Sequence, residues 1–373
     1  MTKHEVISRE LRSEIETGKY GNNGQLPSEA QLVHRFQVSR PTAARALRDL
    51  QNEGLVERRM GSGTFVKPPS ERGTMQRQTT VIGLLVPERG MTEIFDAICG
   101  ELGALAKMQG YGMLWGASTI PLVDHDPSPK HALALCKQFV EKRVDGVFIA
   151  PLETGEDHGS ANRKILEILQ QAGIPVVLLD RDVAPFPKRS SWDLVCMDNF
   201  CAGFLIAEHL IRLGSQNLRF FSYPGSAPTI NARISGVREA LRIHNLEPRE
   251  DLVATGNPTD TEFVRKLRAG RNCDALVCAN DFTAGELIKT LGKLGIQVPG
   301  RVRVAGFDDV RYATLLPVAL TTIHQPCREI AEIAFRVMLE RLRTPTIPPR
   351  TITAAPRLVV RESCGAYEAR EPA

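Results

Sequence analysis

Polar side chains follow several short apolar runs in the second half of the chain, and their types suit hydrogen bonding to a small ligand. They are Asp180-Arg181-Asp182 after VVLL, Asp198-Asn199 after VCM, Asn280-Asp281 after VCA and Asp308-Asp309 after VAGF. Carboxylates, amides and guanidinium groups accept or donate in fixed directions, which suits a ligand rich in hydroxyl groups. A strand-end Asp is also a common turn or helix-capping residue, and we assign Asp281 and Asp309 to that structural class.

A second group of candidate residues is basic and lies near the N-terminus. At about 100° per residue, Arg45, Arg48 and Asn52 fall on one face of a helix, with Arg40 and Thr42 flanking its N-terminal end. Arg reads guanine edges in the major groove, and a helix N-terminus accepts phosphate. The alternative is a solvated face without a partner. The opposite face is apolar and carries Ala43, Ala46, Leu47 and Leu50.

Local signals predict the helices that position these arginines. Ser28 and the Gln three residues later have the spacing of a capping box, which predicts a helix from Ser28 to about Phe36. Ser39 is placed to cap the next helix, with Pro41 tolerated in its first turn, and Gly54 ends it. Two helices joined by so short a connection predict a helix-turn-helix.

A β-hairpin is expected directly after the second helix. Leu55 to Arg59 and Thr64 to Val66 alternate like strands around Met60-Gly61-Ser62-Gly63, so Arg58 and Arg59 lie on a wing that can approach phosphates or the minor groove. The chain is therefore expected to bind double-stranded DNA. The residues expected at the DNA are Ser28, Glu29, Ser39, Arg40, Pro41, Thr42, Arg45, Arg48, Arg58, Arg59, Gly61, Gly63 and Thr64.

The stretch from His4 to Val66 resembles the DNA-binding head of the GntR family. It carries the elements LPSE-x-x-L, VSR-x-T-x-x-x-AL, L-x-x-EGL and RR-x-G-x-GTFV. The resemblance implies a winged helix-turn-helix domain over residues 1–67. Many members have Val-Arg where this chain has Ala43-Ala44, and the next residue, Arg45, is basic instead. The base contact of that missing Arg, and the operator sequence with it, are left open.

Length and charge bound the remaining organisation. A chain of 373 residues predicts two or three compact units. The net charge is +4, and residues 1–67 hold 11 Lys and Arg against 8 Asp and Glu, so most of the excess is local to the predicted head. The N-terminus lacks an apolar signal region, and no stretch approaches the roughly 20 apolar residues that span a bilayer. We expect a cytoplasmic protein with no membrane partner.

The eight cysteines raise the question of a metal or redox site. None forms a CxxC pair, and no His cluster has ligand spacing. Most lie in apolar runs, such as Cys278 in ALVC, where a free Cys behaves as a small core residue. We expect neither a metal nor another cofactor.

The rest of the chain is expected to be an α/β domain behind a polar linker. Residues 68–80 have no apolar periodicity, and from residue 81 to 364 apolar runs alternate with amphipathic helical segments. Continuous apolar strands alternating with helices predict parallel sheets covered on both faces, here as two doubly wound lobes. We assign residues 81–196 and 306–325 to lobe one and residues 197–305 and 326–364 to lobe two.

This second part resembles the effector-binding domain of LacI-type regulators and the related periplasmic-binding-protein-like fold. The matching elements include IGLLVP, VDGVFIAP, IPVVLLDR, AR-x-x-G, AND, GFDD and LTTIHQP. At the matched positions, the resemblance implies that the effector contacts are Asp180, Arg233, Asn280, Asp308 and Gln325. Members often have an aromatic residue after the first strand, which implies that Phe95 stacks on the face of a sugar ring.

Together these features favour a DNA-binding repressor that is controlled by a small effector, and we expect that effector to be a sugar. We also expect the protein to be a homodimer that binds a near-palindromic operator. A purine effector and a ligand-independent DNA binder are alternatives within this class. An exported sugar-binding protein would need a signal peptide, and an aminotransferase-like enzyme fused to the head would need a cofactor-binding Lys, so we expect no catalysis. Residues 363–373 lack a heptad repeat, which leaves dimer and tetramer open.

Overall fold

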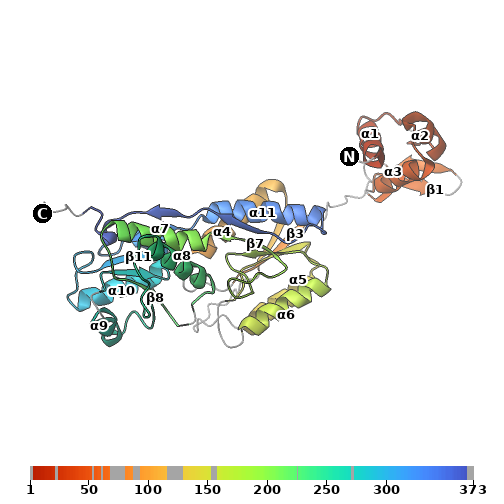
Figure 1. The fold of residues 1–373 in the computed structure, drawn as a ribbon. Coiled ribbons are helices and arrows are strands. Elements are labelled where there is room, and N and C mark those ends of the chain that lie inside the picture. The colour runs from red at the N-terminus through yellow and green to blue at the C-terminus, as the bar shows by residue number, and fades with distance from the viewer. Residues whose placement is uncertain are drawn as a thin grey trace. The chain divides into compact units, whose positions relative to one another are not determined.

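The chain forms two compact units, Met1–Thr80 and Val81–Ala373, which we call the head and the body. The computed structural model describes residues 3–21, 24–52, 54–59, 62–67, 80–86, 93–115, 129–152, 158–224, 226–269 and 273–367 (Figure 1). Each unit has its own apolar core.

The head is a three-helix unit with a two-stranded wing. Its elements are α1 (Lys3–Glu16), α2 (Glu29–Phe36), α3 (Arg40–Asn52), β1 (Val56–Arg59) and β2 (Gly63–Val66). The Ser28 hydroxyl accepts from the Gln31 N–H, and the Gln31 side chain accepts from the Ser28 N–H, so the predicted capping box is confirmed. Ala43, Ala46 and Leu50 of α3 are buried against α1 and α2, as the periodicity predicted.

A carboxylate at the end of α1 joins the helices of the head. Glu14 accepts two hydrogen bonds from the guanidinium of Arg35 on α2, at 2.6 and 2.9 Å. It also contacts Lys19 and the hydroxyl of Tyr20. The Arg35 hydrogen bond is the main reason that the pKa of Glu14 falls to about 2, well below its usual range.

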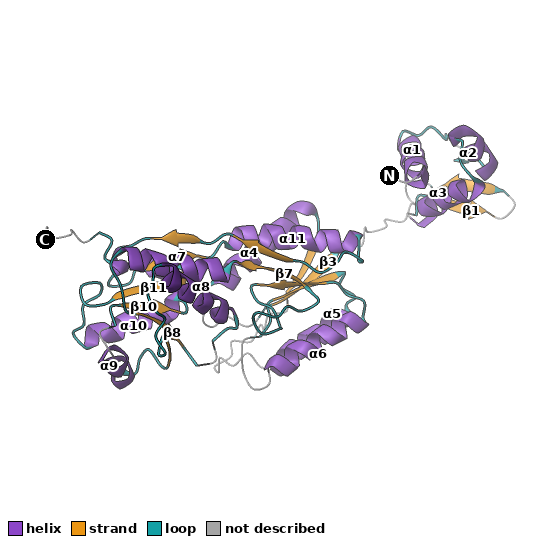
Figure 2. Ribbon diagram, in the orientation of Figure 1, coloured by secondary structure: helices purple, strands orange, loops and turns teal. Residues whose placement is uncertain are grey.

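The body contains two six-stranded sheets, which confirms the predicted α/β class with two lobes (Figure 2). All neighbouring strands are parallel except the β12–β14 pair. Lobe one has the order β13-β7-β6-β5-β3-β4, with β3 (Val81–Leu85), β4 (Gly112–Trp115), β5 (Gly146–Ile149), β6 (Val176–Leu179), β7 (Asp193–Met197) and β13 (Thr351–Ala354). Lobe two has the order β14-β12-β11-β10-β8-β9, with β8 (Leu218–Ser222), β9 (Val253–Thr255), β10 (Ala275–Cys278), β11 (Arg303–Asp308), β12 (Thr321–His324) and β14 (Arg357–Val359).

Helices cover both faces of each sheet, as buried parallel strands require. In lobe one, α4 (Ile94–Gln109) and α11 (Cys327–Arg343) pack together on one face, and α5 (Pro129–Glu141) and α6 (His158–Gln171) on the other. In lobe two, the pairs are α7 (Asn199–Arg212) with α8 (Thr229–Ile243) and α9 (Thr261–Ala269) with α10 (Asp281–Lys293). Short 3-10 helices span Arg311–Thr314 and Glu362–Cys364. Within the described residues, no helix has the length and apolarity that a membrane crossing needs.

The predicted division of the body into lobes was wrong in its C-terminal half. The strands β11 and β12 were expected in lobe one, but β11 pairs with β10 and β12 pairs with β11 in the sheet of lobe two. Residues 326–364 were all expected in lobe two, but α11 packs against α4, and β13 pairs with β7, both in lobe one. Apolar strands look alike in both sheets, so the alternation of strands and helices does not reveal which sheet a strand joins.

Among the residues that the structure describes, the chain crosses between the lobes three times. The crossings run from β7 to α7, from β12 to α11, and from β13 to β14. The first passes through Asp198, which caps α7 by accepting a hydrogen bond from the Cys201 N–H at 2.9 Å. We call these three crossings the hinge, because two packed lobes that are joined by a few connecting segments commonly move about those segments.

Two glycines bring α7 and α8 into backbone contact. A Cβ on Gly203 would collide with the carbonyl oxygen of Arg233, and a Cβ on Gly236 would collide with that of Phe200. Because α7 begins at the hinge, this contact holds Arg233 of α8 close to the first crossing.

Candidate functional sites

The exposed face of α3 presents the basic residues that were predicted at the DNA. Arg40, Arg45 and Arg48 are exposed, and Thr42 is half-buried. The Thr42 hydroxyl lies 2.8 Å from that of Ser39 at the start of the helix. This first turn is the part of a recognition helix that enters the major groove.

Glu29 connects this helix to the wing. Its carboxylate accepts a hydrogen bond from Nε of Arg40 at 3.1 Å and another from Nη2 of Arg58 at 3.2 Å. Glu29 is the first residue of α2, so one carboxylate holds a side chain of α3 and one of β1. The two arginines are thereby oriented before any partner arrives.

The wing is an antiparallel hairpin in which Arg58 pairs with Thr64 and Arg59 with Gly63. The guanidinium of Arg59 lies 4.9 Å from the centre of the Phe65 ring, which fixes its direction. Gly63 has a φ of 115°, a conformation that favours glycine. Gly61, also predicted at the DNA, lies outside the described residues.

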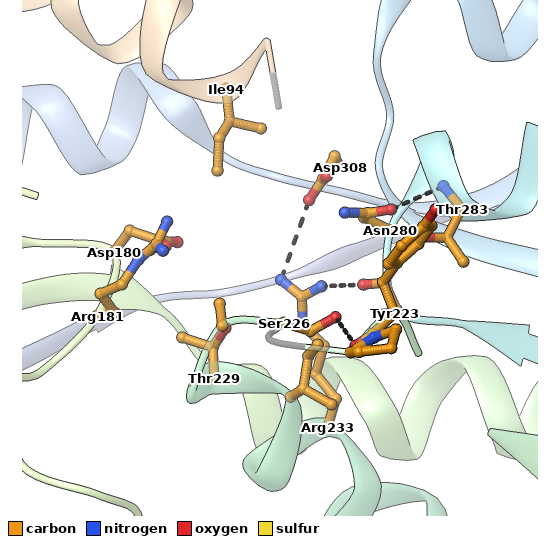
Figure 3. Close-up of a pocket in the computed structure, with 14 residues that line it drawn as sticks. Ile94, Asp180, Arg181, Tyr223, Ser226, Thr229, Arg233, Asn280, Thr283 and Asp308 are labelled. Atoms are coloured by element: carbon orange, nitrogen blue, oxygen red, sulfur yellow. Dashed lines mark hydrogen bonds and ion pairs between the residues drawn. The ribbon is translucent and has the colours of Figure 1, made fainter. Parts of the chain in front are cut away.

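The body contains a cavity of about 600 Å³ between its two lobes, part of which is open to solvent (Figure 3). Lobe one contributes Asp180 and Arg181, at the end of β6, and Ile94 at the start of α4. Across the cavity, lobe two contributes polar residues from α8 and from the carboxyl ends of its strands. They include Tyr223, Ser226, Thr229, Arg233, Asn280, Thr283 and Asp308.

Arg233 is the most tightly held of these side chains. Its Nη1 donates to the carbonyl oxygen of Ala279 at 2.6 Å, and its Nε donates to Oδ1 of Asn199 at 2.8 Å. Its Nη2 lies 4.0 Å from Oδ1 of Asp308, and the guanidinium lies 4.4 Å from the centre of the Phe307 ring. Burial lowers the pKa of Arg233, and the charge of Asp308 opposes that shift.

Two aspartates reach the cavity from unusual backbone conformations. Asp180 has a φ of 66° and Asp308 a φ of 113°, which is uncommon for residues other than glycine and is often found at functional sites. Asp180 accepts from Nε of Arg181 at 3.1 Å and from Nε2 of Gln325 at 3.2 Å. The carboxylate of Asp180 is therefore held in place at the cavity wall.

Asn280 has a double role at the end of β10. Its side-chain oxygen accepts from the N–H of Thr283 at 2.8 Å and caps α10. The oxygen is thereby occupied, and the amide nitrogen lies on the side of the group away from Thr283 (Figure 3). Asn280 lines the cavity, and this nitrogen is its side-chain donor group.

The structure brings four of the six predicted effector residues to the cavity wall: Asp180, Arg233, Asn280 and Asp308. The other two lie behind it. Phe95 is buried, and Arg181 lies over its ring with the guanidinium 5.2 Å from the ring centre. Gln325 is buried and holds Asp180. In this structure Phe95 contacts Arg181 of the cavity wall and Gln325 contacts Asp180 of the wall, and neither lines the cavity itself.

Sequence reasoning missed several residues of the cavity wall. Arg181 was noted among the polar strand-end residues but was not predicted as an effector contact. Thr229 lies one helical turn before Arg233 on α8, so helical spacing could have found it. Tyr223 and Ser226 lie between β8 and α8 and gave no such signal.

Asp281 and Asp309 were expected to be turn or helix-capping residues, but their side-chain contacts join separate segments of lobe two, and Asn280 is the residue that caps α10. Asp281 is fully buried and accepts from the Thr322 hydroxyl at 2.6 Å and from the Val310 N–H at 3.1 Å. Asp309 contacts Arg361 and lies 2.9 Å from Nδ1 of His324. Both tie the strand ends of lobe two together.

Two family descriptions match separate parts of the chain. Residues 3–66 match the bacterial regulatory proteins of the gntR family, and residues 207–364 match the periplasmic binding protein-like domain.

Individual proteins are similar over longer stretches. The arabinose metabolism transcriptional repressor of Geobacillus stearothermophilus is 26% identical over 373 residues, covering 97% of this chain and 98% of that protein. The HTH-type transcriptional repressor PurR of Vibrio campbellii is 29% identical over 290 residues, covering 76% of this chain and 81% of that protein. The solved complex of the transcriptional regulator CelR with cellobiose has a TM-score of 0.64 at 23% identity, over 88% of this chain and 92% of that one.

Proposed function

We propose that this chain is a repressor whose operator affinity changes when a sugar occupies the cleft of the body. It is a DNA-binding transcriptional regulator that joins a GntR-type helix-turn-helix domain to a periplasmic-binding-protein-like domain. The observation that carries the proposal is the pairing of an exposed basic helix and wing in the head with a polar interlobe cavity in the body. We propose no catalytic step, and we assign the action to the cytoplasm, where the operator is.

In the head, we assign each residue its proposed contact with DNA from the element on which it lies. Arg40, Thr42 and Arg45 lie in the first half of α3 and read base edges. Arg58 and Arg59 lie on β1 of the wing and hold the phosphate backbone. The remaining predicted DNA residues position these five or contact phosphate.

In the body, the proposed ligand is a sugar because the cavity wall offers directed polar groups from both lobes. Asp180 and Asp308 accept from hydroxyl groups, and Arg233 and Asn280 donate to them. The similarity to a repressor named for arabinose metabolism supports a sugar without identifying which one.

Control of DNA binding requires that the ligand favour one arrangement of the lobes. A ligand held by Asp180 from lobe one and Arg233 from lobe two stabilises the closed cleft. We propose that two chains pair through their bodies and that closure changes how their heads meet a near-palindromic operator. Coupling between such sites is typically about 1 to 3 kcal/mol, a change in operator affinity of several-fold to roughly 150-fold.

Replacing Arg233 tests the cavity. We expect Arg233→Ala to abolish the response to ligand and to leave operator binding intact, because Arg233 lies in the body and the DNA-contacting residues lie in the head. Arg238→Ala, an exposed change on the same helix, is the control.

The measurement has two parts. A thermal-shift screen of sugars, sugar acids, sugar phosphates and purines identifies the ligand, since a ligand at 100 times its dissociation constant stabilises by about 2.7 kcal/mol. Operator affinity is then measured with and without it. A normal ligand response in Arg233→Ala would refute this cavity as the effector site, and a purine hit would replace the sugar.

A further inference from the structure

A second hollow, of about 560 Å³, adjoins the cavity described above. The two share Asp180, Arg181 and Thr229 in their walls, so they meet at the point where lobe one faces the start of α8. The second hollow also lies between the lobes, since β13 of lobe one lines it with Thr353 and α7 of lobe two lines it with Phe200.

The wall of the second hollow is more apolar than that of the first. Phe186 is half-buried, Met197 is buried, and Phe200 is 44% exposed at the rim. Thr353 and Arg189 are exposed and add a hydroxyl and a guanidinium. Aromatic and aliphatic walls with a few polar groups suit the apolar face of a ring whose polar groups lie at its edge.

The carboxylates of this wall are already engaged. Both oxygens of Asp182 accept backbone hydrogen bonds, from the N–H of Ala184 at 2.9 Å and of Ser190 at 3.1 Å. Asp198 accepts from the N–H of Cys201 at 2.9 Å. The second hollow therefore offers contact with a ring face and fewer directed hydrogen bonds than the first cavity.

The charge of the wall argues against an anionic ligand. Arg181 and Arg189 are opposed there by Asp180, Asp182 and Asp198, so the lining residues carry no positive excess. A phosphate or carboxylate group would find no surplus cation among them. The favoured occupant is a neutral group with apolar faces.

We infer that the effector is a disaccharide or a longer sugar chain, with one ring in the polar cavity and the next in the second hollow. The glycosidic link passes Thr229 and Arg181, which belong to both walls. This inference rests on the proposed sugar effector and extends it, because a monosaccharide fills only one of the two hollows.

Isothermal titration calorimetry on the full chain tests the inference with matched sugar pairs: L-arabinose with α-1,5-arabinobiose, D-xylose with xylobiose, and D-glucose with cellobiose. We expect the disaccharide of at least one pair to bind at least about ten-fold tighter than its monosaccharide. Phe200→Ala should remove most of that preference and leave monosaccharide affinity unchanged. Phe186→Ala should do the same if the stacking is shared.

The control is Ile243→Ala, which truncates an equally exposed apolar residue, 51% exposed, at the far end of α8. It should preserve the preference. Equal binding of monosaccharide and disaccharide, or a preference that Phe200→Ala leaves intact, overturns the second subsite and leaves a sugar effector standing. If none of the saccharides tested binds and a purine does, the sugar effector fails as well.

Discussion

Glu14 shows how much one residue contributes to the head. Its folded pKa of about 2 lies below the usual 4.5, so the unfolded head takes up a proton more readily than the folded one. The stabilisation is complete above about pH 4.5 and is lost as the pH falls toward 2. Glu14→Gln should therefore lower the stability of the head by about 1 to 3 kcal/mol at pH 7, by less than half of that at about pH 3, and by little at about pH 2.

Methyl resonances of Ile7 and Ile15, both buried in the head, report this unfolding by NMR in the full chain. The control is Glu10→Gln, because Glu10 also contacts Arg35, at 2.7 Å, but is 48% exposed against 11% for Glu14. An exposed pair of that kind contributes about 0 to 1 kcal/mol. Equal effects of the two changes would contradict the special role of Glu14.

At the same scale, the sequence located cavity residues through strand-end positions and, for Arg233, through the resemblance to LacI-type regulators. Asp180, Asn280 and Asp308 end apolar strands, and the carboxyl ends of parallel strands share one edge of a sheet. Tyr223 lies in a connection whose path depends on the packing of both neighbours, and no residue nearby in sequence predicts it. Gln325 reaches Asp180, 145 residues away in the chain, so its role follows from tertiary structure alone.

At the scale of elements, the wing can be tested through its salt dependence. Arg58→Ala should weaken binding to all DNA sequences alike. It should also reduce the slope of the logarithm of the binding constant against the logarithm of the salt concentration by about one unit, if Arg58 neutralises one phosphate. Operator and unrelated duplexes are titrated by fluorescence anisotropy at several salt concentrations. Lys107→Ala, an exposed change in the body, is the control. An unchanged slope would remove the wing from the interface.

The elements themselves were predictable to different degrees. The Ser28 capping box and the apolar face of α3 depend on residues within a few positions of one another, and both are confirmed. The sheet to which β11, β12 and β13 belong depends on pairing with strands far away in the chain. A pattern of period two or 3.6 carries no information on that choice, which is why the lobe boundaries were misassigned.

At the scale of the whole molecule, Asn199 connects the proposed effector cavity to the hinge. Its side chain accepts from Arg233 at 2.8 Å and donates to the carbonyl oxygen of Met197 at 3.1 Å, on the lobe-one side of the first crossing. We expect Asn199→Ala to bind ligand within a few-fold of the unaltered chain while losing most of the ligand-dependent change in operator affinity.

A thermodynamic cycle measures this coupling: operator affinity is determined with and without ligand, and ligand affinity with and without operator. The two ratios must agree, because linkage is reciprocal. Asn231→Ala, an exposed amide on α8, is the control and should keep the coupling. Full coupling in Asn199→Ala would mean that the hinge receives the signal by another route.

The three crossings between the lobes also bear on the order in which the protein can fold during synthesis. The head precedes the body in the chain, and its core is formed by its own residues. The body depends on β13 and β14, which complete its two sheets and follow in the chain the strands that they pair with. A growing or prematurely ended chain would therefore carry a finished head on an unfinished body, able to meet nucleic acid before it can be regulated.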